Sequence, residues 1–352
     1  MENSKLNNLI ETAIKEGASD LHLSTGHYPT IRVSGDLIPL IKENVLTKED
    51  SDLFIRLFLN KEEVEIFFNN QEMDFSYESK SGTRFRGNAF FQKDGIGIAL
   101  RVIQSEIKTT TELNLPPIID AFSRKKQGFF LVVGPVGQGK STTLASMVEL
   151  INNERAEHIV TIEDPIEYIF KPKHSLIDQR EVRINTKDFH SALNGAFRQD
   201  VDVIMLGEMR GPETMSASVT AAETGHLVLS TLHTNNASQT VDRIIDSFPP
   251  TQQQQIRMQL AGSLLGIFSQ RLIPRISGGL IPAYELLINN NAVASLIREG
   301  RTHEIDVIIE TGSKDGMIDM DRSLADLVRK GEIAPEQAYL HSLKPKVLER
   351  LL

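Results

Sequence analysis

One stretch of this 352-residue chain has the residue types and spacing that phosphate binding needs, Gly134-Pro-Val-Gly-Gln-Gly-Lys-Ser-Thr142. It fits the pattern GxxxxGK[ST], follows the apolar run 128–133 and precedes 140–151, which has the composition of a helix. A buried strand, a glycine-rich turn and a helix N-terminus together present backbone N–H groups and a partial positive charge to phosphates. We therefore expect this loop to bind a nucleoside triphosphate.

Two side chains of the loop have expected roles of their own. Lys140 is expected to reach the β- and γ-phosphates, and Ser141 to place a hydroxyl on Mg²⁺. The alternative is a chance match, which the four fixed positions would produce in roughly one chain of this length in a hundred. The expected phosphate-binding residues are Gly134, Pro135, Val136, Gly137, Gln138, Gly139, Lys140, Ser141 and Thr142.

Two acidic motifs follow apolar runs that read as strands. Glu163 lies in Thr161-Ile-Glu-Asp-Pro-Ile-Glu167, and Glu208 follows the run 203–206. Ligands of open α/β sheets gather beyond the carboxyl ends of the strands. Carboxylates there can orient an attacking water or hold magnesium. Taken alone, a glutamate at a strand end is better interpreted as a solvated loop residue, but a phosphate loop upstream and two such motifs at suitable distances reverse that preference.

Two histidines flank the apolar run 227–231. His226 precedes it and His233 follows it. A histidine beside a phosphate site can donate to the γ-phosphate and sense its loss, whereas the ordinary alternative is a neutral histidine bonded to a backbone carbonyl. Both interpretations stay open for each residue. Zinc binding is not expected, because no third ligand lies at suitable spacing.

The composition is that of an ordinary globular protein, and the length suits about two domains. The net charge of −9 and an aromatic content of 6% argue against a nucleic-acid motor, which needs basic grooves and stacking platforms. The chain has no cysteine, which excludes disulfides and thiolate metal sites. No apolar run is long enough for a membrane span and the N-terminus does not read as a signal peptide, so we expect a soluble, cytoplasmic protein.

The pattern of the chain predicts two domains joined by a linker. Residues 1–104 read as a small α/β domain, with helices over 6–14, 48–58 and 61–68 and strands over 20–24, 30–34, 37–40, 75–78, 83–91 and 96–103. The polar, threonine-rich stretch 105–117 is the expected linker.

From residue 118 to 352 the pattern changes to strands alternating with helices, typical of a parallel sheet. The expected strands are 129–133, 158–162, 203–206 and 227–231. After Pro249 and Pro250 we expect a mostly helical region.

Together these motifs resemble the type II secretion and type IV pilus ATPases, and within that family most closely the pilus retraction motors. The likeness covers nearly the whole chain, from Gly17-Ala-Ser-Asp-Leu-His-Leu-Ser24 through Arg84-Phe-Arg-Gly-Asn-Ala-Phe90, the phosphate loop and both acidic motifs to the histidine segment and Leu296-Ile-Arg-Glu299. The resemblance implies an N-terminal PAS-like α+β domain, then a RecA-like ATPase domain with a helical C-terminal part. It implies ATP and Mg²⁺ as ligands, with ATP between the two domains.

The same resemblance implies an assembly and roles for particular residues. It implies a homohexamer that acts on an inner-membrane platform protein of the pilus, without nucleic acid. Glu163 would polarise the attacking water, Glu208 would act on magnesium, and His226 and His233 would sense the nucleotide. Arg84, Arg86 and Arg101 would neutralise phosphate charge, although solvated or cross-strand-paired arginines are at least as good an interpretation of these three.

The chain departs from the family pattern at three places. Ala294 replaces the first arginine of Ala-Ile-Arg-Asn-Leu-Ile-Arg-Glu, a segment linked to retraction, so a partner contact could differ. Val201 replaces a proline in the Asp-Pro-Asp before the second acidic strand, a change in loop stiffness. Val136 and Gln138 stand where Thr and Ser are commoner, and we expect them to contribute mainly backbone.

Three other functions remain as alternatives. The missing four-cysteine zinc insertion favours a retraction motor over an assembly or secretion ATPase, with an accessory pilus ATPase as the nearest alternative. A nucleic-acid motor is the second. A nucleotide-gated scaffold without turnover is the third, and the intact Glu163 and Glu208 argue against it.

Overall fold

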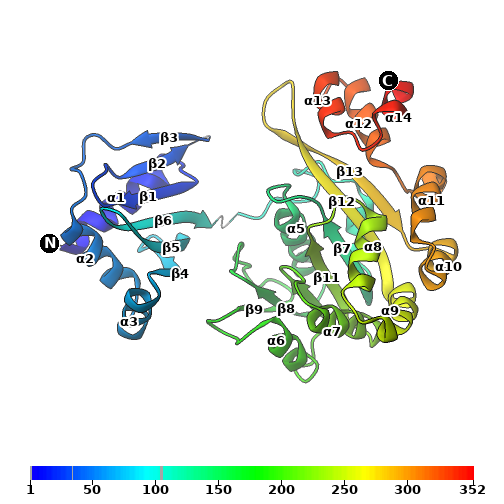
Figure 1. Ribbon diagram of the computed structural model, residues 1–352, viewed down its shortest axis with the longest axis horizontal. Coiled ribbons are helices and arrows are strands. Elements are labelled where there is room, and N and C mark those ends of the chain that lie inside the picture. The colour runs from blue at the N-terminus through cyan, green and yellow to red at the C-terminus, as the bar shows by residue number, and fades with distance from the viewer. Residues whose placement is uncertain (1, 34, 104–105) are drawn as a thin grey trace. The chain divides into compact units, whose positions relative to one another are not determined.

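A computed structural model describes residues 2–33, 35–103 and 106–352. The chain divides into two compact units, the first made mainly of residues up to Glu106 and the second mainly of residues from Ile107 onward. Each unit has its own hydrophobic core. The two units are therefore described separately (Figure 1).

The first unit is an antiparallel sheet with three helices. The sheet has the order β3-β2-β1-β6-β5-β4, and its apolar face packs on helix side chains such as Leu9, Phe54 and Phe67. Thr47 and Asn60 start two of the helices with capping boxes, as their side chains accept N–H groups of the first turn. The elements are α1 (Glu2–Lys15), β1 (Asp20–Ser24), β2 (Thr30–Val33), β3 (Asp36–Pro39), α2 (Lys48–Phe58), α3 (Lys61–Asn70), β4 (Glu72–Glu78), β5 (Arg84–Gln92) and β6 (Gly95–Ile103).

Every element expected in this unit is present within four residues at each end, and the largest difference is the start of α1 at Glu2 instead of residue 6. Residue 34, the last of one expected strand, and residues 104 and 105, at the expected junction with the linker, lie outside the described residues. The α+β class of this unit is confirmed.

The second unit is built on a sheet of order β13-β12-β7-β11-β10-β8-β9. Six neighbouring strands run parallel, and β13 is antiparallel to β12. The elements up to the hairpin are α4 (Ile118–Ser123), β7 (Gly128–Val133), α5 (Lys140–Glu154), β8 (His158–Glu163), β9 (Leu176–Glu181), α6 (Phe189–Ala196), β10 (Val203–Leu206), α7 (Pro212–Glu223), β11 (Leu227–Leu232), α8 (Ala237–Asp246) and α9 (Pro250–Ser263).

The central strands are the continuous apolar runs of the sequence. Every residue of β7, β10 and β11 is buried, because helices cover both faces of a parallel sheet. The register places Leu232 of β11 opposite Val133 of β7, and Leu206 of β10 opposite Ser230. The carboxyl ends of these strands therefore lie at one edge of the sheet.

The C-terminal part contains a long hairpin that the sequence interpretation did not include. β12 (Leu264–Pro274) and β13 (Leu280–Ile288) form it, and β12 also pairs with β7. The rest is helical as expected: α10 (Asn291–Glu299), α11 (Ile305–Thr311), α12 (Met320–Arg329), α13 (Pro335–His341) and α14 (Pro345–Leu351), with short 3₁₀ turns at Thr302–Glu304 and Gly312–Asp315. In Figure 1, α12, α13 and α14 gather beside the hairpin.

An apolar cluster joins the hairpin to these last helices. Ile273 and Ile281 of the hairpin pack with Leu324, Leu327 and other side chains of the helical region. In the part of the chain that the structure describes, no helix is long and apolar enough to cross a membrane.

Candidate functional site

The expected phosphate loop lies between β7 and α5, at the carboxyl edge of the sheet. Gly137 and Gly139 have φ values of 78° and 76°, a backbone region that glycine adopts most readily. Gly139 is the N-cap residue of α5, so no side chain covers the start of a 15-residue helix. The loop therefore has the strand–turn–helix geometry that places a helix N-terminus against phosphate.

Lys140, the first residue of α5, is only 8% exposed. Its ammonium donates to the carbonyl oxygens of Gly134 at 2.9 Å and Pro135 at 2.8 Å. The lysine is thus held across the inside of the loop, where its charge is available to an anion seated there.

The two predicted carboxylates lie at the ends of neighbouring strands. Glu163 ends β8 and is 4% exposed, and the Thr161 hydroxyl donates to its Oε1 at 2.7 Å. Glu208 follows β10, one residue after Gly207, whose carbonyl accepts the Thr231 hydroxyl at 2.6 Å. Since β7, β11, β10 and β8 are neighbouring parallel strands, the loop and both carboxylates lie at the same edge of the sheet.

His233 connects the loop to Glu208. Its Nδ1 lies 3.3 Å from the Lys140 Nζ, and its Nε2 lies 3.4 Å from Glu208 Oε2. A lysine ammonium can only donate, so Nδ1 accepts and the ring proton sits on Nε2, facing the carboxylate. The structure therefore brings Lys140, His233 and Glu208 together, as three parts of the predicted site.

Two arginines that the sequence interpretation did not select also lie here. Arg210 forms ion pairs with Glu208 and, at 3.7 Å, with Asp164, while Arg183 lies 3.6 Å from Asp164. The hydrogen bond that the Arg210 guanidinium donates to Glu208 raises the pKa of Arg210 above its ordinary value. The sequence could have indicated Arg210, because it follows the same strand as Glu208 and is only two residues away from it in Gly207-Glu-Met-Arg210.

His226 precedes β11, so the structure does not bring it to the phosphate loop of its own chain, and its expected role in sensing nucleotide stays a prediction. It precedes β11, whereas His233 follows it, and a six-residue strand spans about 20 Å. Its Nδ1 donates to the Ala221 carbonyl at 3.0 Å, and its ring meets Phe197 edge-on. This is the ordinary alternative, a histidine bonded to a backbone carbonyl.

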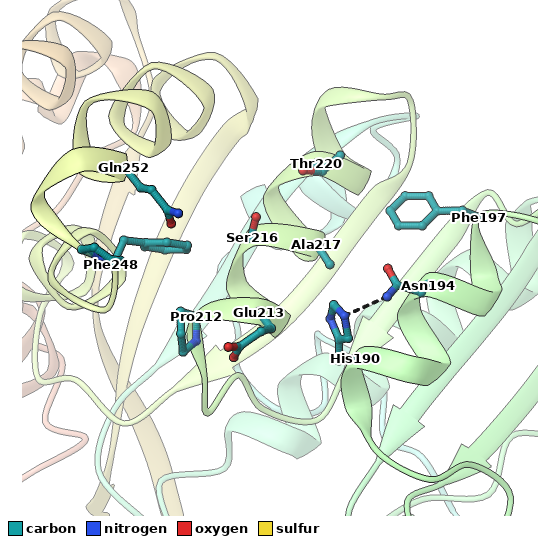
Figure 2. A pocket seen from close by; sticks show the side chains of 11 residues that line it. His190, Asn194, Phe197, Pro212, Glu213, Ser216, Ala217, Thr220, Phe248 and Gln252 are labelled. Atoms are coloured by element: carbon teal, nitrogen blue, oxygen red, sulfur yellow. Dashed lines mark hydrogen bonds between the residues drawn. The ribbon is translucent and has the colours of Figure 1, made fainter.

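Phe197 also lines an open hollow of about 600 Å³. Figure 2 shows α6, α7 and the start of α9 around it, with His190 hydrogen-bonded to Asn194. Phe248 lines the hollow from the α9 side. None of the predicted site residues lines this hollow.

The three predicted N-terminal arginines belong to the first unit. Arg101 donates to Asp20 at 2.8 Å, and together with the Ser19 hydroxyl it lowers the pKa of Asp20 against the opposing effect of burial. Arg84 lies 3.8 Å from Glu78. Arg86 lies opposite Arg101 on the neighbouring strand. Arg84 and Arg101 thus pair with acidic side chains of their own unit, as the alternative interpretation of paired surface arginines expects.

Two departures from the family pattern have structural consequences. Gln138 contributes its side chain as well as its backbone, contrary to our expectation, because its Oε1 accepts the Leu272 N–H at 2.7 Å. Val136, in contrast, is 80% exposed. Ala294 is buried on α10 within the core of the second unit.

Gln270 and Thr143 are further residues of the site that the sequence interpretation missed. The Gln270 side chain on β12 donates to the Gln138 carbonyl at 2.8 Å and accepts the Thr143 hydroxyl at 2.7 Å. The sequence carried no signal for either residue, because β12 itself was not expected and both partners of Gln270 lie more than a hundred positions away.

The chain matches known proteins along most of its length. Residues 2–279 match the model of the type II/IV secretion system protein family. The type IV pilus retraction ATPase PilT of Pseudomonas aeruginosa is 43% identical over 94% of this chain and 96% of its own. The type IV pilus ATPase PilU of the same organism is 38% identical over 95% of this chain and 87% of its own.

The fold matches as well. A crystal structure of the pilus retraction motor PilT with bound ADP is 43% identical, with a TM-score of 0.92 and 98% of both chains covered. The expected architecture of an N-terminal domain, a RecA-like core and a helical C-terminal region is thereby confirmed. On this sequence and fold evidence, the chain belongs to the type II/IV secretion system protein family.

Proposed function

We propose that this chain is an ATP-hydrolysing motor that drives retraction of a type IV pilus. The observation that carries the proposal is the contact chain from Lys140 through His233 to Glu208, with separations of 3.3 and 3.4 Å. It links the group that would bind the transferred phosphate to the carboxylate at the neighbouring strand end. The relatives named as pilus ATPases supply the biological context.

In this proposal the loop and the N-terminus of α5 bind the triphosphate through backbone N–H groups. Lys140 exchanges its carbonyl partners Gly134 and Pro135 for β- and γ-phosphate oxygens. Glu163 polarises the water that attacks the γ-phosphate. The Thr161 hydroxyl holds the Glu163 side chain in position for this role. His233 reports the state of the γ-phosphate to Glu208.

A divalent cation fits the oxygen donors at this edge. Mg²⁺ is commonly bound by one or two carboxylates together with substrate phosphates. In the described residues, no group of three or more acidic or histidine side chains could hold a metal by itself. Ser141 and Glu208 would hold Mg²⁺ jointly with the triphosphate, and the cation would neutralise phosphate charge.

Three features of the assembly belong to the same proposal. Domains over 1–104 and 118–352, joined by a linker over 105–117, form the subunit of a homohexamer. Arg84, Arg86 and Arg101 neutralise phosphate charge from the N-terminal domain. The ring acts on a platform protein from the cytoplasmic face of the inner membrane.

An accessory pilus ATPase is the second candidate function. Ala294 replaces an arginine of the segment linked to retraction, and its position on α10 is buried. The relative named PilU matches 95% of this chain. A retraction motor remains the better supported function, since the relative named PilT is more similar in sequence.

Deletion of the gene in the source organism tests the proposal. We expect surface pili to accumulate without retracting, and the wild-type gene, but not Lys140→Ala, to restore retraction. Normal retraction in the deletion strain would exclude the primary motor role and leave the accessory one. Purified protein that stays a monomer both with and without ATP and Mg²⁺ would contradict the ring.

A further inference from the structure

β12 extends beyond the strand that carries the phosphate loop. Ser269 lies opposite Val133, the last residue of β7. From there β12 continues to Pro274, paired only with β13 in the described sheet. Gln270 and Leu272 lie in this continuation, so they flank the loop that begins after Val133.

The Gln270 side chain holds both ends of the turn into α5. It is 3% exposed. Its Nε2 donates to the Gln138 carbonyl at 2.8 Å, and its Oε1 accepts the Thr143 hydroxyl at 2.7 Å. Rotating the amide by 180° would place oxygen against the carbonyl, so the two contacts together fix its orientation.

The Gln138 side chain returns a contact to the same strand. Its Oε1 accepts the Leu272 N–H at 2.7 Å. Leu272 lies opposite Pro282 of β13 and past the end of β7, so the loop supplies the acceptor for this N–H. A serine at position 138 would be too short to reach it from the same backbone.

The loop also lies against the backbone of Gln270. A Cβ atom on Gly134 would lie 2.4 Å from the Gln270 carbonyl oxygen, and one on Gly139 would lie 3.0 Å from its Nε2. At these distances the loop backbone packs directly on β12, and a side chain at Gly134 would collide with the strand. The two glycines are required by this neighbour as well as by their positive φ values.

We propose that Gln270 and Gln138 form a clamp that holds the phosphate loop in the conformation that accepts nucleotide. Gln270 is a positioning residue, acting through the Gln138 carbonyl and Thr143 without touching the nucleotide. The inference rests on the proposed nucleotide site. Without the clamp the loop samples other conformations, and the apparent affinity falls in proportion to the population that remains competent.

The test uses the full-length protein with Gln270→Met, Gln270→Glu, Gln138→Ser and the double variant Gln270→Met with Gln138→Ser. Gln254→Met, an exposed position on α9, is the matched control. The measurements are the Kd of a fluorescent ADP analogue, the shift in Tm on adding ADP, and the KM and kcat for ATP.

Each single clamp variant is expected to raise Kd and KM about tenfold, with kcat at saturating ATP retained within about threefold. Gln270→Glu fails like Gln270→Met, because a carboxylate cannot donate to the Gln138 carbonyl. The double variant is expected to lose little more than either single variant, since both hold one loop. Gln254→Met keeps wild-type values.

Two results would overturn the clamp. One is wild-type Kd in all clamp variants. The other is a lowered kcat with unchanged Kd and KM, which indicates a loss of folded protein rather than of loop geometry. The variant Lys140→Ala distinguishes failure of the clamp from failure of the proposed nucleotide site. If Lys140→Ala also binds ADP with wild-type affinity, the nucleotide site itself is misplaced.

Discussion

The Lys140 ammonium lies 3.3 Å from the Nδ1 atom of His233, although the two residues are far apart in the chain. The register of β7 with β11 brings them together, because Val133 and Leu232 are opposite each other. His233 therefore lies between the Lys140 ammonium and Glu208, where it contacts both.

Replacing His233 by alanine is expected to lower kcat for ATP about 10- to 100-fold, the range for a lost hydrogen bond to a charged group. Steady-state kinetics with a Kd measurement for ADP provide the test. His226→Ala is the matched control, because His226 lies at the other end of β11. An equal loss of activity in both variants would contradict the placement of His226 away from the site.

Lys140→Ala is expected to abolish productive binding of ATP. The loop then loses the ammonium that donates to its Gly134 and Pro135 carbonyls and that the proposal assigns to the β- and γ-phosphates. Calorimetric titration with ATP and Mg²⁺ measures the effect, and Lys173→Ala, on the exposed surface, serves as control. Wild-type affinity in Lys140→Ala would place the nucleotide elsewhere.

Glu163→Gln is expected to retain nucleotide binding and to lower the hydrolysis rate by about two to four orders of magnitude, the usual cost of losing a positioned base. Glu208→Gln should instead weaken the Mg²⁺ dependence of binding. Single-turnover hydrolysis and Mg²⁺ titrations distinguish them. If Glu163→Gln turned over at a near-native rate while Glu208→Gln did not, the two roles would be exchanged.

Glu285 of β13 predicts a pH dependence of stability. Burial raises its pKa from 4.5 to about 7, with smaller contributions from Asp306 and Asp319, against the opposing effects of the Ala237 N–H and Lys344. The folded state therefore holds this proton more tightly than the unfolded state. The group's contribution to stability is complete below pH 4.5 and is lost as the pH rises to about 7, a loss of about 3 kcal/mol.

Glu285→Gln keeps an acceptor for the Ala237 N–H without the charge. The difference in unfolding free energy between this variant and the wild type should grow in the variant's favour by about 3 kcal/mol from pH 4.5 to pH 8. Urea unfolding at several pH values measures it. Glu349→Gln, at an exposed position, should show no such trend. A pH-independent difference for Glu285→Gln would exclude the buried titration.

The sequence predicted the strand–loop–helix arrangement at residues 128–154 well because local signals there agree. β7 is a continuous apolar run, and the loop has glycines where positive φ is needed. Glu163 ends one buried strand and Glu208 follows another. The sequence placed His226 before β11 and His233 after it, but left open whether each histidine senses phosphate or bonds to a backbone carbonyl. The contacts that distinguish these interpretations, Lys140 and Glu208 for His233 and Ala221 for His226, are visible only in the structure.

The hairpin was missed for a different reason. β12 carries the polar residues Ser269, Gln270 and Arg271 in its second half, which break the pattern of a buried strand. Gln270 is buried all the same, because its partners are Gln138 and Thr143. Such partners come from residues more than a hundred positions away, and a local pattern carries no record of them.

The cluster between the hairpin and the last helices limits how this chain can be shortened. Cutting the chain before α12 would expose Ile273 and Ile281 on the hairpin whose first strand also bears Gln270. If such a shortened form lost ATP hydrolysis, two explanations would fit equally. The nucleotide loop could be displaced through β12, or the surface that binds the platform protein could be missing. Point substitutions on the outer surface of α13 or α14 are the cleaner way to separate attachment from catalysis.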